Sequence, residues 1–255
     1  MKAKIAERLL TLNHQFYTDF GDSFSATRSR LQPGVRTILA SLRGDETILD
    51  LGCGNGGLAR ALASRGHRGA YLGLDFSLSL LREANSLPEG FSAKFVEMDM
   101  TKLSMSAHQL PIASGGSTLN EQWSLITAFA TLHHIPSHTL RLQLLQTVQS
   151  LLAPHGRFIH SNWQFLNSPR LRGRIRPWSE IGLTQEDVDP GDYLLDWRAG
   201  GHGLRYVHYF AQDELAALAA SSGFEIVETF YSDGKEGNLA VYQTWEKARQ
   251  HRIEI

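Results

Sequence analysis

The 255-residue sequence has only one cysteine, Cys53, and no apolar run long enough to cross a bilayer. A single cysteine excludes an internal disulfide and any zinc site built from several cysteines. The first 20 residues mix charged and apolar side chains, whereas a secretory signal peptide has a continuous apolar block. We therefore expect a cytoplasmic protein without membrane segments.

Neither sign of charge is in excess, since 25 lysines and arginines accompany 26 aspartates and glutamates, and the chain lacks repeats and low-complexity tracts. Such a balance gives no global sign of a nucleic-acid partner, so any basic surface must be local. With 42% hydrophobic residues, the chain suits one domain over 1–255, or a core domain with an elaborated insert.

Short apolar runs alternate with amphipathic segments from Thr47 onward, and this pattern predicts a parallel sheet with helices on both faces. The expected strands are 47–51, 70–75, 93–97, 123–129 and 157–163, and the expected helices are 58–64, 77–84 and 137–152.

The alternation stops over 164–206, where Pro, Gly, Arg and Trp accumulate. A helix over 212–221 and strands over 224–231 and 238–245 are then expected. The linker SDGKEG between these strands predicts an antiparallel hairpin. The ordinary dinucleotide-binding fold repeats its parallel half instead, so the hairpin favours another nucleotide-like ligand.

Four glycines follow the first expected strand in ILDLGCGNGGLARALA, namely Gly52, Gly54, Gly56 and Gly57. Without Cβ atoms they let a ligand touch the backbone, and the following helix presents N–H groups to it. Their spacing differs from the G-x-G-x-x-G of pyrophosphate-binding enzymes. We interpret Cys53, which lies among them, as a small buried residue rather than a nucleophile.

Two aspartates end the next two expected strands. Asp75 can accept both hydrogen bonds of a ribose diol, and Asp99 is placed to accept one from an adenine amino group. An aspartate after a strand is more often a cap or turn residue. Together with the glycines, in order and at strand-helix spacing, the two indicate a nucleoside site.

The motifs DLGCGNG, GLDFS, EMDM and AFATLHHIP resemble those of class I S-adenosylmethionine-dependent methyltransferases over 47–163. The resemblance implies a Rossmann-like α/β fold: a seven-stranded, mostly parallel sheet with a C-terminal antiparallel hairpin and helices on both faces. It implies S-adenosyl-L-methionine as cofactor and S-adenosyl-L-homocysteine as product. The cofactor-binding residues that it implies are Asp50, Gly52, Cys53, Gly54, Asn55, Gly56, Asp75, Phe76, Asp99, Met100, Phe129 and Ala130.

Three further segments, DSFSATRSRLQPGVRTIL, PGDYLLDW and LRYVHYF, look like parts of the eukaryotic tRNA wobble-uridine carboxymethyl methyltransferases. This family converts a carboxylate on the uridine side chain to its methyl ester, and some members use a small zinc-binding activator subunit. The matching residues are Phe24, Thr27, Arg28, Gly191, Asp192, Trp197, Arg205, Tyr206 and His208.

Methylating a carboxylate needs no general base, because the group is ionised at neutral pH and must only be aligned and partly desolvated. Arg205 or Arg28 could hold it through paired donors, or Arg28 could hold the cofactor's own carboxylate. Tyr206, His208 and His133 complete the expected catalytic set, although His208 could equally be a packing residue. His133, His134 and His138 have no carboxylate at the spacing of a metal ligand, so we expect no metal site.

Arg170, Arg172, Arg174 and Arg176 stand at alternate positions, so an extended chain would project them on one side. Arginines with nearby tryptophans suit a single-stranded RNA loop, here tRNA, although a solvated loop balanced by acidic residues would look similar. The helix expected over 5–20 is interpreted as a lid in which Tyr17 closes over the cofactor.

These features divide the chain into an N-terminal lid segment (1–46), a cofactor-binding core (47–163), a substrate-recognition insert (164–210) and a final helix with hairpin (211–255). A tRNA methyltransferase is the first hypothesis. A small-molecule O-methyltransferase would share the core and differ only in the insert. A nicotinamide-dependent oxidoreductase and a non-catalytic cofactor-binding subunit are the alternatives from other classes.

Overall fold

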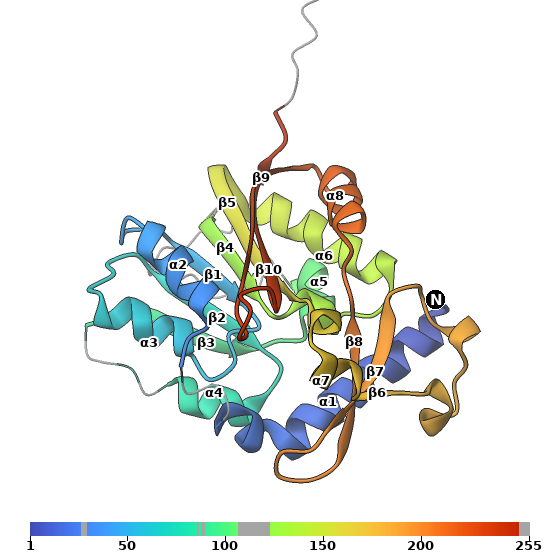
Figure 1. The fold of residues 1–255 in the computed structure, drawn as a ribbon. Helices are drawn as coiled ribbons and strands as arrows, with labels where there is room; N and C mark the ends of the chain where they lie inside the picture. The colour runs from blue at the N-terminus through green and yellow to red at the C-terminus, as the bar shows by residue number, and fades with distance from the viewer. Residues whose placement is uncertain (27–29, 86, 88–89, 107–122, 250–255) are drawn as a thin grey trace, which may run out of the picture.

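The central sheet has seven strands in the order β3-β2-β1-β4-β5-β10-β9 (Figure 1). The computed structural model describes residues 1–26, 30–85, 87, 90–106 and 123–249. The α/β fold with a seven-stranded, mostly parallel sheet is confirmed. The strands are β1 (Ile48–Leu51), β2 (Tyr71–Asp75), β3 (Ala93–Glu97), β4 (Trp123–Phe129), β5 (Leu152–Trp163), β9 (Phe224–Ser232) and β10 (Ala240–Lys247).

The C-terminal hairpin is antiparallel, as its turn sequence predicts, and β10 lies between β5 and β9. β5 begins five residues earlier than expected. Leu152 pairs with Trp123 before a register shift brings the rest of β5 alongside β4. Because Leu152 is fully buried, this early pairing places an apolar side chain inside the core.

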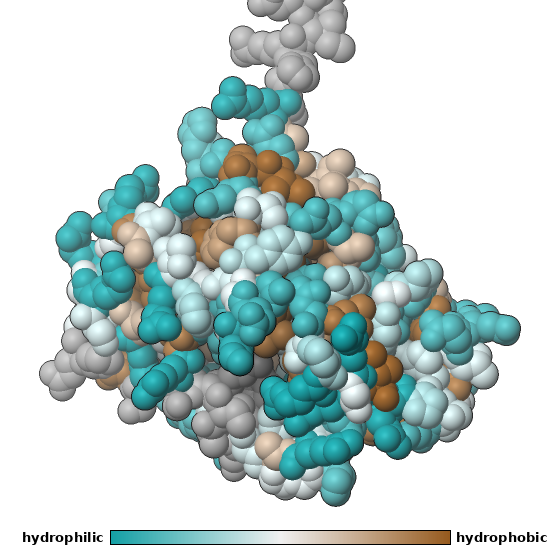
Figure 2. Space-filling model, in the orientation of Figure 1, coloured by the Kyte–Doolittle hydropathy of each residue, from teal (hydrophilic) through white to brown (hydrophobic). Residues whose placement is uncertain are grey.

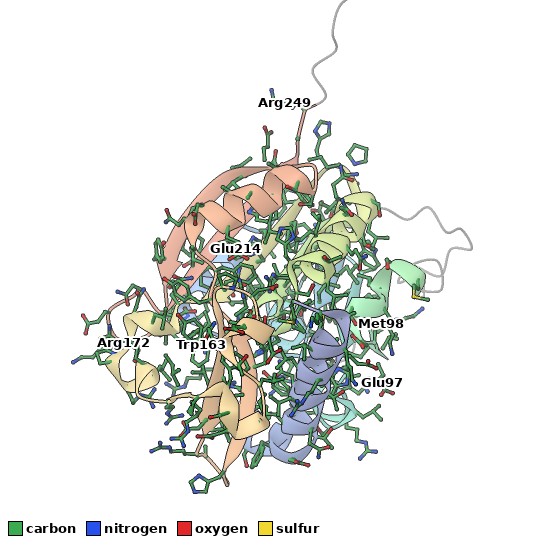
Figure 3. The ribbon with its side chains drawn as sticks, turned by 90° about the vertical axis from the view of Figure 1, so that its right-hand side faces the viewer. Glu97, Met98, Trp163, Arg172, Glu214 and Arg249 are labelled. Carbon is green, nitrogen blue, oxygen red and sulfur yellow. The ribbon has the colours of Figure 1, made fainter. Side chains whose placement is uncertain are left out.

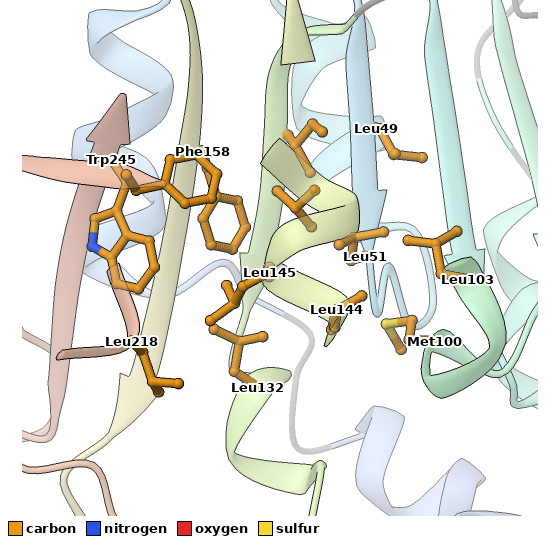
Figure 4. Packing of buried hydrophobic residues seen from close by; sticks show 14 of the residues in the cluster. Leu49, Leu51, Met100, Leu103, Leu132, Leu144, Leu145, Phe158, Leu218 and Trp245 are labelled. Carbon is orange, nitrogen blue, oxygen red and sulfur yellow. The ribbon is translucent and has the colours of Figure 1, made fainter. Parts of the chain in front are cut away.

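Helices cover both faces of the sheet, because side chains alternate between the two faces along each strand. Ile48 packs with α2 (Pro33–Ser41) and α3 (Gly57–Ser64), whereas Leu49 faces the opposite cluster. That second cluster includes residues of α5 (Leu103–Ser106), α6 (His138–Leu151) and α8 (Gln212–Ser221), and Figure 4 shows part of it. α4 (Leu78–Ala84) follows β2.

The insert forms its own antiparallel sheet from β6 (Ile175–Arg176), β7 (Asp192–Trp197) and β8 (Gly203–His208). The long N-terminal helix α1 (Ala3–Ala26) packs against this sheet (Figure 1). Leu9 of α1, for example, is fully buried in one cluster with Trp178 and Leu194. The expected lid helix is therefore held mainly by the insert.

The arginine-rich stretch is not extended, so the prediction that Arg170, Arg172, Arg174 and Arg176 project on one side is wrong. Pro169 occupies the start of a short helix, α7 (Pro169–Arg172), where its fixed φ and missing N–H are tolerated. Arg170 and Arg172 lie in this helix, and Arg176 follows in β6.

Several short 3-10 helices connect the larger elements. In chain order they are η1 (Met100–Lys102), η3 (Leu132–His134), η4 (Phe165–Asn167), η5 (Trp178–Ile181) and η6 (Gln185–Asp187). η1 and η3 follow β3 and β4, and so lie at the edge of the sheet where the parallel strands end.

Hydrophilic side chains cover most of the face seen in Figure 2. Among the described residues, the exposed large apolar side chains lie on α4, α5 and β9, and they are Leu78, Met105, Val227 and Tyr231. Within the described ranges, no helix combines the length and apolarity needed to cross a membrane.

Replacing Trp245 by Ala should lower the free energy of unfolding by about 3–5 kcal/mol, because it empties a fully buried site beside Phe158 and Phe224. Val227→Ala in the same hairpin is the control, since that side chain is 48% exposed and its loss should change stability by about 0.5 kcal/mol or less. Urea unfolding measures both. Equal losses would contradict this description of the core.

Candidate functional site

A pocket of about 410 Å³ lies where the parallel strands end, and the lid helix and the insert also line it. The carboxyl ends of parallel strands meet at one edge of a sheet, where ligands of this architecture bind. The predicted cofactor residues that line this pocket are Asp50, Gly52, Cys53, Gly54, Asn55, Asp75, Phe76, Asp99, Met100, Phe129 and Ala130.

Three glycines of the turn after β1 have positive φ, but they face different surroundings. At Gly52 (φ +75°) a Cβ would overlap the side chain of Thr131. At Gly56 (φ +75°) it would lie 2.9 Å from Ala84 Cβ, so Gly56 packs against α4. Gly56 was expected to line the pocket but does not. At Gly54 (φ +53°) a Cβ would meet no atom of the described residues within 4 Å, so this backbone is bare toward the pocket.

Asp75 joins the glycine turn to the end of β2. Its Oδ2 accepts a hydrogen bond from Gly54 N and its Oδ1 accepts one from Ser77 N, both at 2.9 Å. The side chain is buried, and this burial raises the pKa of Asp75. A carboxylate has about four acceptor positions, so Asp75 keeps acceptor capacity for a ligand.

Asp50 lies one layer deeper, at the centre of the sheet. It accepts hydrogen bonds from Tyr71 Oη at 2.5 Å and from Thr127 Oγ1 at 2.7 Å. Burial raises the pKa of Asp50 from 3.8 to about 6, although the two hydroxyl donors oppose this shift. Its hydrogen bonds connect β1 to β2 and β4, the strands that carry the pocket.

Asp99 is both a helix-cap residue and a pocket-lining residue. It caps η1, because its Oδ1 accepts hydrogen bonds from Thr101 N at 3.0 Å and from Thr101 Oγ1 at 2.7 Å. It also lines the pocket beside Met100. A cap residue at a strand end can therefore also face a ligand.

The lid helix closes one side of the pocket with two aromatic rings. His14 stacks on Phe76 with ring centroids 4.3 Å apart, and Tyr17 meets the same ring edge-on at 5.6 Å. Tyr17 Oη lies 2.9 Å from His134 Nε2, and His134 Nδ1 lies 3.4 Å from the carbonyl oxygen of Tyr206. Because that carbonyl only accepts, a neutral His134 carries its hydrogen on Nδ1 and accepts from Tyr17 at Nε2.

Arg205 of β8 brings a cation to the pocket. Its guanidinium lies 4.9 Å from the ring centre of Trp163 and 5.4 Å from those of Phe16 and Trp197. The side chain is 95% buried, and Arg170 also lines the pocket. Two arginines of the insert thus line the same pocket as the aspartates of the core. Cation–π contacts of this kind hold a guanidinium in a partly dehydrated setting.

His133 is almost fully buried and lines the pocket next to this cationic side. Its Nδ1 accepts a hydrogen bond from Trp163 N at 3.3 Å, so a neutral His133 carries its hydrogen on Nε2. In the described part of the chain, no three His, Cys, Asp or Glu residues are grouped to hold a metal ion.

Tyr206 and His208 do not line the pocket, which corrects the expectation that they contact an acceptor. Side chains alternate along β8, so these two point to the face opposite Arg205. Tyr206 Oη donates to Asp192 Oδ1 at 2.6 Å, and His208 lies between Asp192 and Glu214. Both are buried in a polar network behind the strand.

The remaining predicted residues lie elsewhere. Arg28 and Thr27 are outside the described residues. Arg172, Arg174 and Arg176 do not line the pocket, and Arg176 Nε donates to Glu180 Oε1 at 2.7 Å. Figure 3 shows Arg172 at the edge of the molecule and Trp163 well inside it.

Sequence reasoning missed His14 and Asp233 as lining residues. The His14–Tyr17 spacing, which puts both on one face of a helix, was an available signal. Asp233 sits in the hairpin turn (φ +68°) and accepts hydrogen bonds from Gly34 N at 3.0 Å and Tyr242 Oη at 2.7 Å. Its turn sequence gave no sign of a position at the pocket.

Comparisons with known proteins agree with this architecture. A family model described as a methyltransferase domain matches residues 24–229. A protein of Encephalitozoon cuniculi that is named as a methyltransferase is 25% identical over 217 residues, covering 84% of this chain and 88% of that protein. The Schizosaccharomyces pombe tRNA (carboxymethyluridine(34)-5-O)-methyltransferase is 25% identical over 240 residues, covering 86% of this chain and 90% of that protein.

Solved structures share the fold. The magnesium protoporphyrin IX methyltransferase of Synechocystis PCC 6803, solved with bound S-adenosylhomocysteine, superposes with a TM-score of 0.62 at 17% sequence identity. The match covers 94% of this chain and 99% of that one.

Relative to Asp50→Asn, the unchanged protein should lose about 3 kcal/mol of stability as the pH rises from below 4 to above 6, because ionising the buried carboxylate costs free energy. The pKa of Asp50 is about 6 in the native state against an ordinary value of 3.8. Between pH 3.8 and pH 6 the native state therefore binds a proton that the unfolded state has released. The stability of the unchanged protein relative to Asp50→Asn should therefore fall from pH 4 to 6 and then level off.

Urea unfolding over pH 4–8 measures this difference. Asp45→Asn, at an exposed carboxylate, is the control and should show no comparable pH-dependent gain. A stability difference between Asp50→Asn and the unchanged protein that is constant from pH 4 to 8 would show that burial does not perturb Asp50.

Proposed function

The chain belongs to the methyltransferase domain family, and we propose that the acceptor of this S-adenosylmethionine-dependent enzyme is a carboxylate on a modified tRNA wobble uridine. The family assignment sets aside the oxidoreductase and the non-catalytic subunit. The single observation that carries the acceptor proposal is the buried guanidinium of Arg205 in the wall of the pocket that the aspartates also line.

The pocket residues fit the cofactor. Gly54 offers bare backbone where a Cβ would have no neighbour, and Asp75 lies beside it with acceptor positions to spare. We assign the methionine part to Gly52 and Gly54, the ribose to Asp75 and the adenine to Asp99 and Met100. When bound, the cofactor supplies an activated methyl group on a sulfonium sulfur.

The insert residues fit a carboxylate acceptor. Arg205 presents a planar set of N–H donors that can orient a carboxylate, and Phe16, Trp163 and Trp197 exclude water around it. His133 adds a further donor through Nε2. Since the acceptor is already ionised, none of these residues has to remove a proton. Their contribution is alignment and partial desolvation.

Two observations support RNA as the carrier of this carboxylate. The chain aligns with the S. pombe tRNA methyltransferase over most of both proteins. Arg170 lines the pocket while Arg172 is exposed on the same short helix, where it could meet a phosphate. A small zinc-binding activator subunit remains a predicted partner, and co-purification with such a protein would test it.

Asp75→Asn should weaken binding of S-adenosylhomocysteine at least about 10-fold, because hydrogen bonds to a charged acceptor are stronger than those to a neutral one. Isothermal titration calorimetry measures the affinity. Glu225→Gln, at an exposed carboxylate on β9, should bind as the unchanged protein does. Equal affinities for Asp75→Asn and the unchanged protein would refute the ribose assignment.

Arg205→Gln should lower kcat/KM for carboxymethyluridine-bearing tRNA about 100-fold and leave S-adenosylhomocysteine affinity unchanged, because only acceptor alignment is lost. Arg205→Lys keeps the charge but not the paired donors, so its kcat/KM should lie between those of Arg205→Gln and the unchanged protein. Arg198→Gln, whose exposed side chain pairs with Asp196, is the control. The assay follows labelled methyl from the cofactor into RNA.

The label should be released as methanol in mild alkali, as a methyl ester requires. Alkali-stable label in RNA would overturn the carboxylate assignment. Transfer to a small carboxylic acid but not to tRNA would favour the small-molecule O-methyltransferase instead.

A further inference from the structure

A buried network of ionisable side chains lies behind β8, on the face opposite Arg205. Asp192 Oδ1 accepts hydrogen bonds from both Tyr206 Oη and His208 Nδ1, each at 2.6 Å. Glu214 of α8 faces the other side of the His208 ring. The network joins four elements; its members are Asp192 (β7), Tyr206 and His208 (β8), Arg141 (α6) and Glu214 (α8).

Both nitrogens of His208 face carboxylates. Nδ1 lies 2.6 Å from Asp192 Oδ1, and Nε2 lies 2.9 Å from each oxygen of Glu214. A neutral imidazole has one nitrogen that only accepts, and that lone pair would face a carboxylate at hydrogen-bond distance. When both carboxylates are ionised, only the imidazolium donates to both of them. Its charge and that of Arg141 then balance the two carboxylates within the network.

Arg141 extends the network to a second wall of the pocket. It is 99% buried, and its Nη1 donates to the carbonyl oxygen of Ile135 at 3.0 Å and to Tyr206 Oη at 3.4 Å. Its Nη2 contacts Glu214 Oε1 at 3.5 Å. Ile135 directly follows η3, which carries His133. The network therefore contacts both β8 and the η3 segment, here called the histidine loop, on the side away from the pocket.

The main chain of β8 is held from the lid side as well. Asn13 of α1 accepts a hydrogen bond from Tyr206 N at 2.8 Å and donates to Tyr206 O at 3.1 Å. Arg205 is the preceding residue. Because neighbouring residues of a strand point to opposite faces, fixing Tyr206 and His208 on one face sets the direction of Arg205 on the other.

We propose that His208, as an imidazolium held between Asp192 and Glu214, is a positioning residue that aims Arg205 at the acceptor. His208 itself touches no substrate. The link to the acceptor rests on the proposed function of Arg205, whereas the charge state of His208 does not.

The charge state is tested directly by ¹⁵N NMR of the histidine rings in the full-length protein at pH 7. The His208 signals, assigned by their loss in His208→Gln, should show two protonated nitrogens. His160 is the internal control, since burial lowers its pKa to about 3 and keeps it neutral. An unprotonated nitrogen on His208 would overturn the proposal.

The positioning role is tested by a charge-matched pair of variants. His208→Gln leaves two carboxylates with one arginine, and should raise the KM for the tRNA acceptor about 10-fold without changing S-adenosylhomocysteine affinity. The double variant His208→Gln with Glu214→Gln removes one charge of each sign and should restore KM to within about 3-fold of the unchanged protein. A double variant as impaired as the single would contradict the charge argument.

A stability control separates positioning from general loss of structure. Glu46 is buried just before β1, at the end of the central sheet where the parallel strands begin. Its carboxylate accepts hydrogen bonds from Arg43 N and Gly44 N. Glu46→Gln should lower the melting temperature without changing KM. If no RNA acceptor is found, near-ultraviolet circular dichroism still reports on Trp163 and Trp197 around Arg205. His208→Gln should change this signal, and an unchanged spectrum would refute the positioning role.

Discussion

The pocket depends on one hydrogen bond, from the Gly54 backbone N–H to the Asp75 carboxylate at 2.9 Å. β1 and β2 run in parallel register, with Leu51 beside Leu74, so the turn after one strand meets the side chain that ends the other. The turn reaches Asp75 because Gly52 and Gly54 adopt positive φ. The backbone donors compensate part of the cost of burying Asp75, and they also fix where its remaining acceptor positions point.

A second constraint is the set of charges that line the pocket. Most of its carboxylates come from the strand ends of the core, whereas the guanidinium groups of Arg170 and Arg205 come from the insert. The aromatic rings around Arg205 reduce its contact with water, and electrostatic interactions are stronger where water is excluded. The core therefore suits a nucleoside cofactor, and the proposed acceptor site lies at the insert. The lid helix connects the two, since Tyr17 contacts the core histidine loop and Asn13 contacts β8.

The core could be predicted from sequence because its signals are local. Glycine spacing, apolar runs and the SDGKEG turn indicate most of the strands and the hairpin with little help from distant contacts. The insert could not be predicted in this way. Whether Arg205 or Tyr206 faces the pocket depends on how β8 pairs with β7 and packs on α1, and neither is visible in the local pattern. Alternation along a strand shows only that adjacent residues point apart, so Arg205 and Tyr206 could not both have lined one pocket.

The structure of the protein with bound S-adenosylhomocysteine is the most direct test of this account. The homocysteine part should lie over Gly52 and Gly54, the ribose hydroxyls on Asp75, and the sulfur should face the side of the pocket where Arg205 lies. A nucleoside bound with its base against Arg205, or a sulfur turned away from the insert, would contradict it.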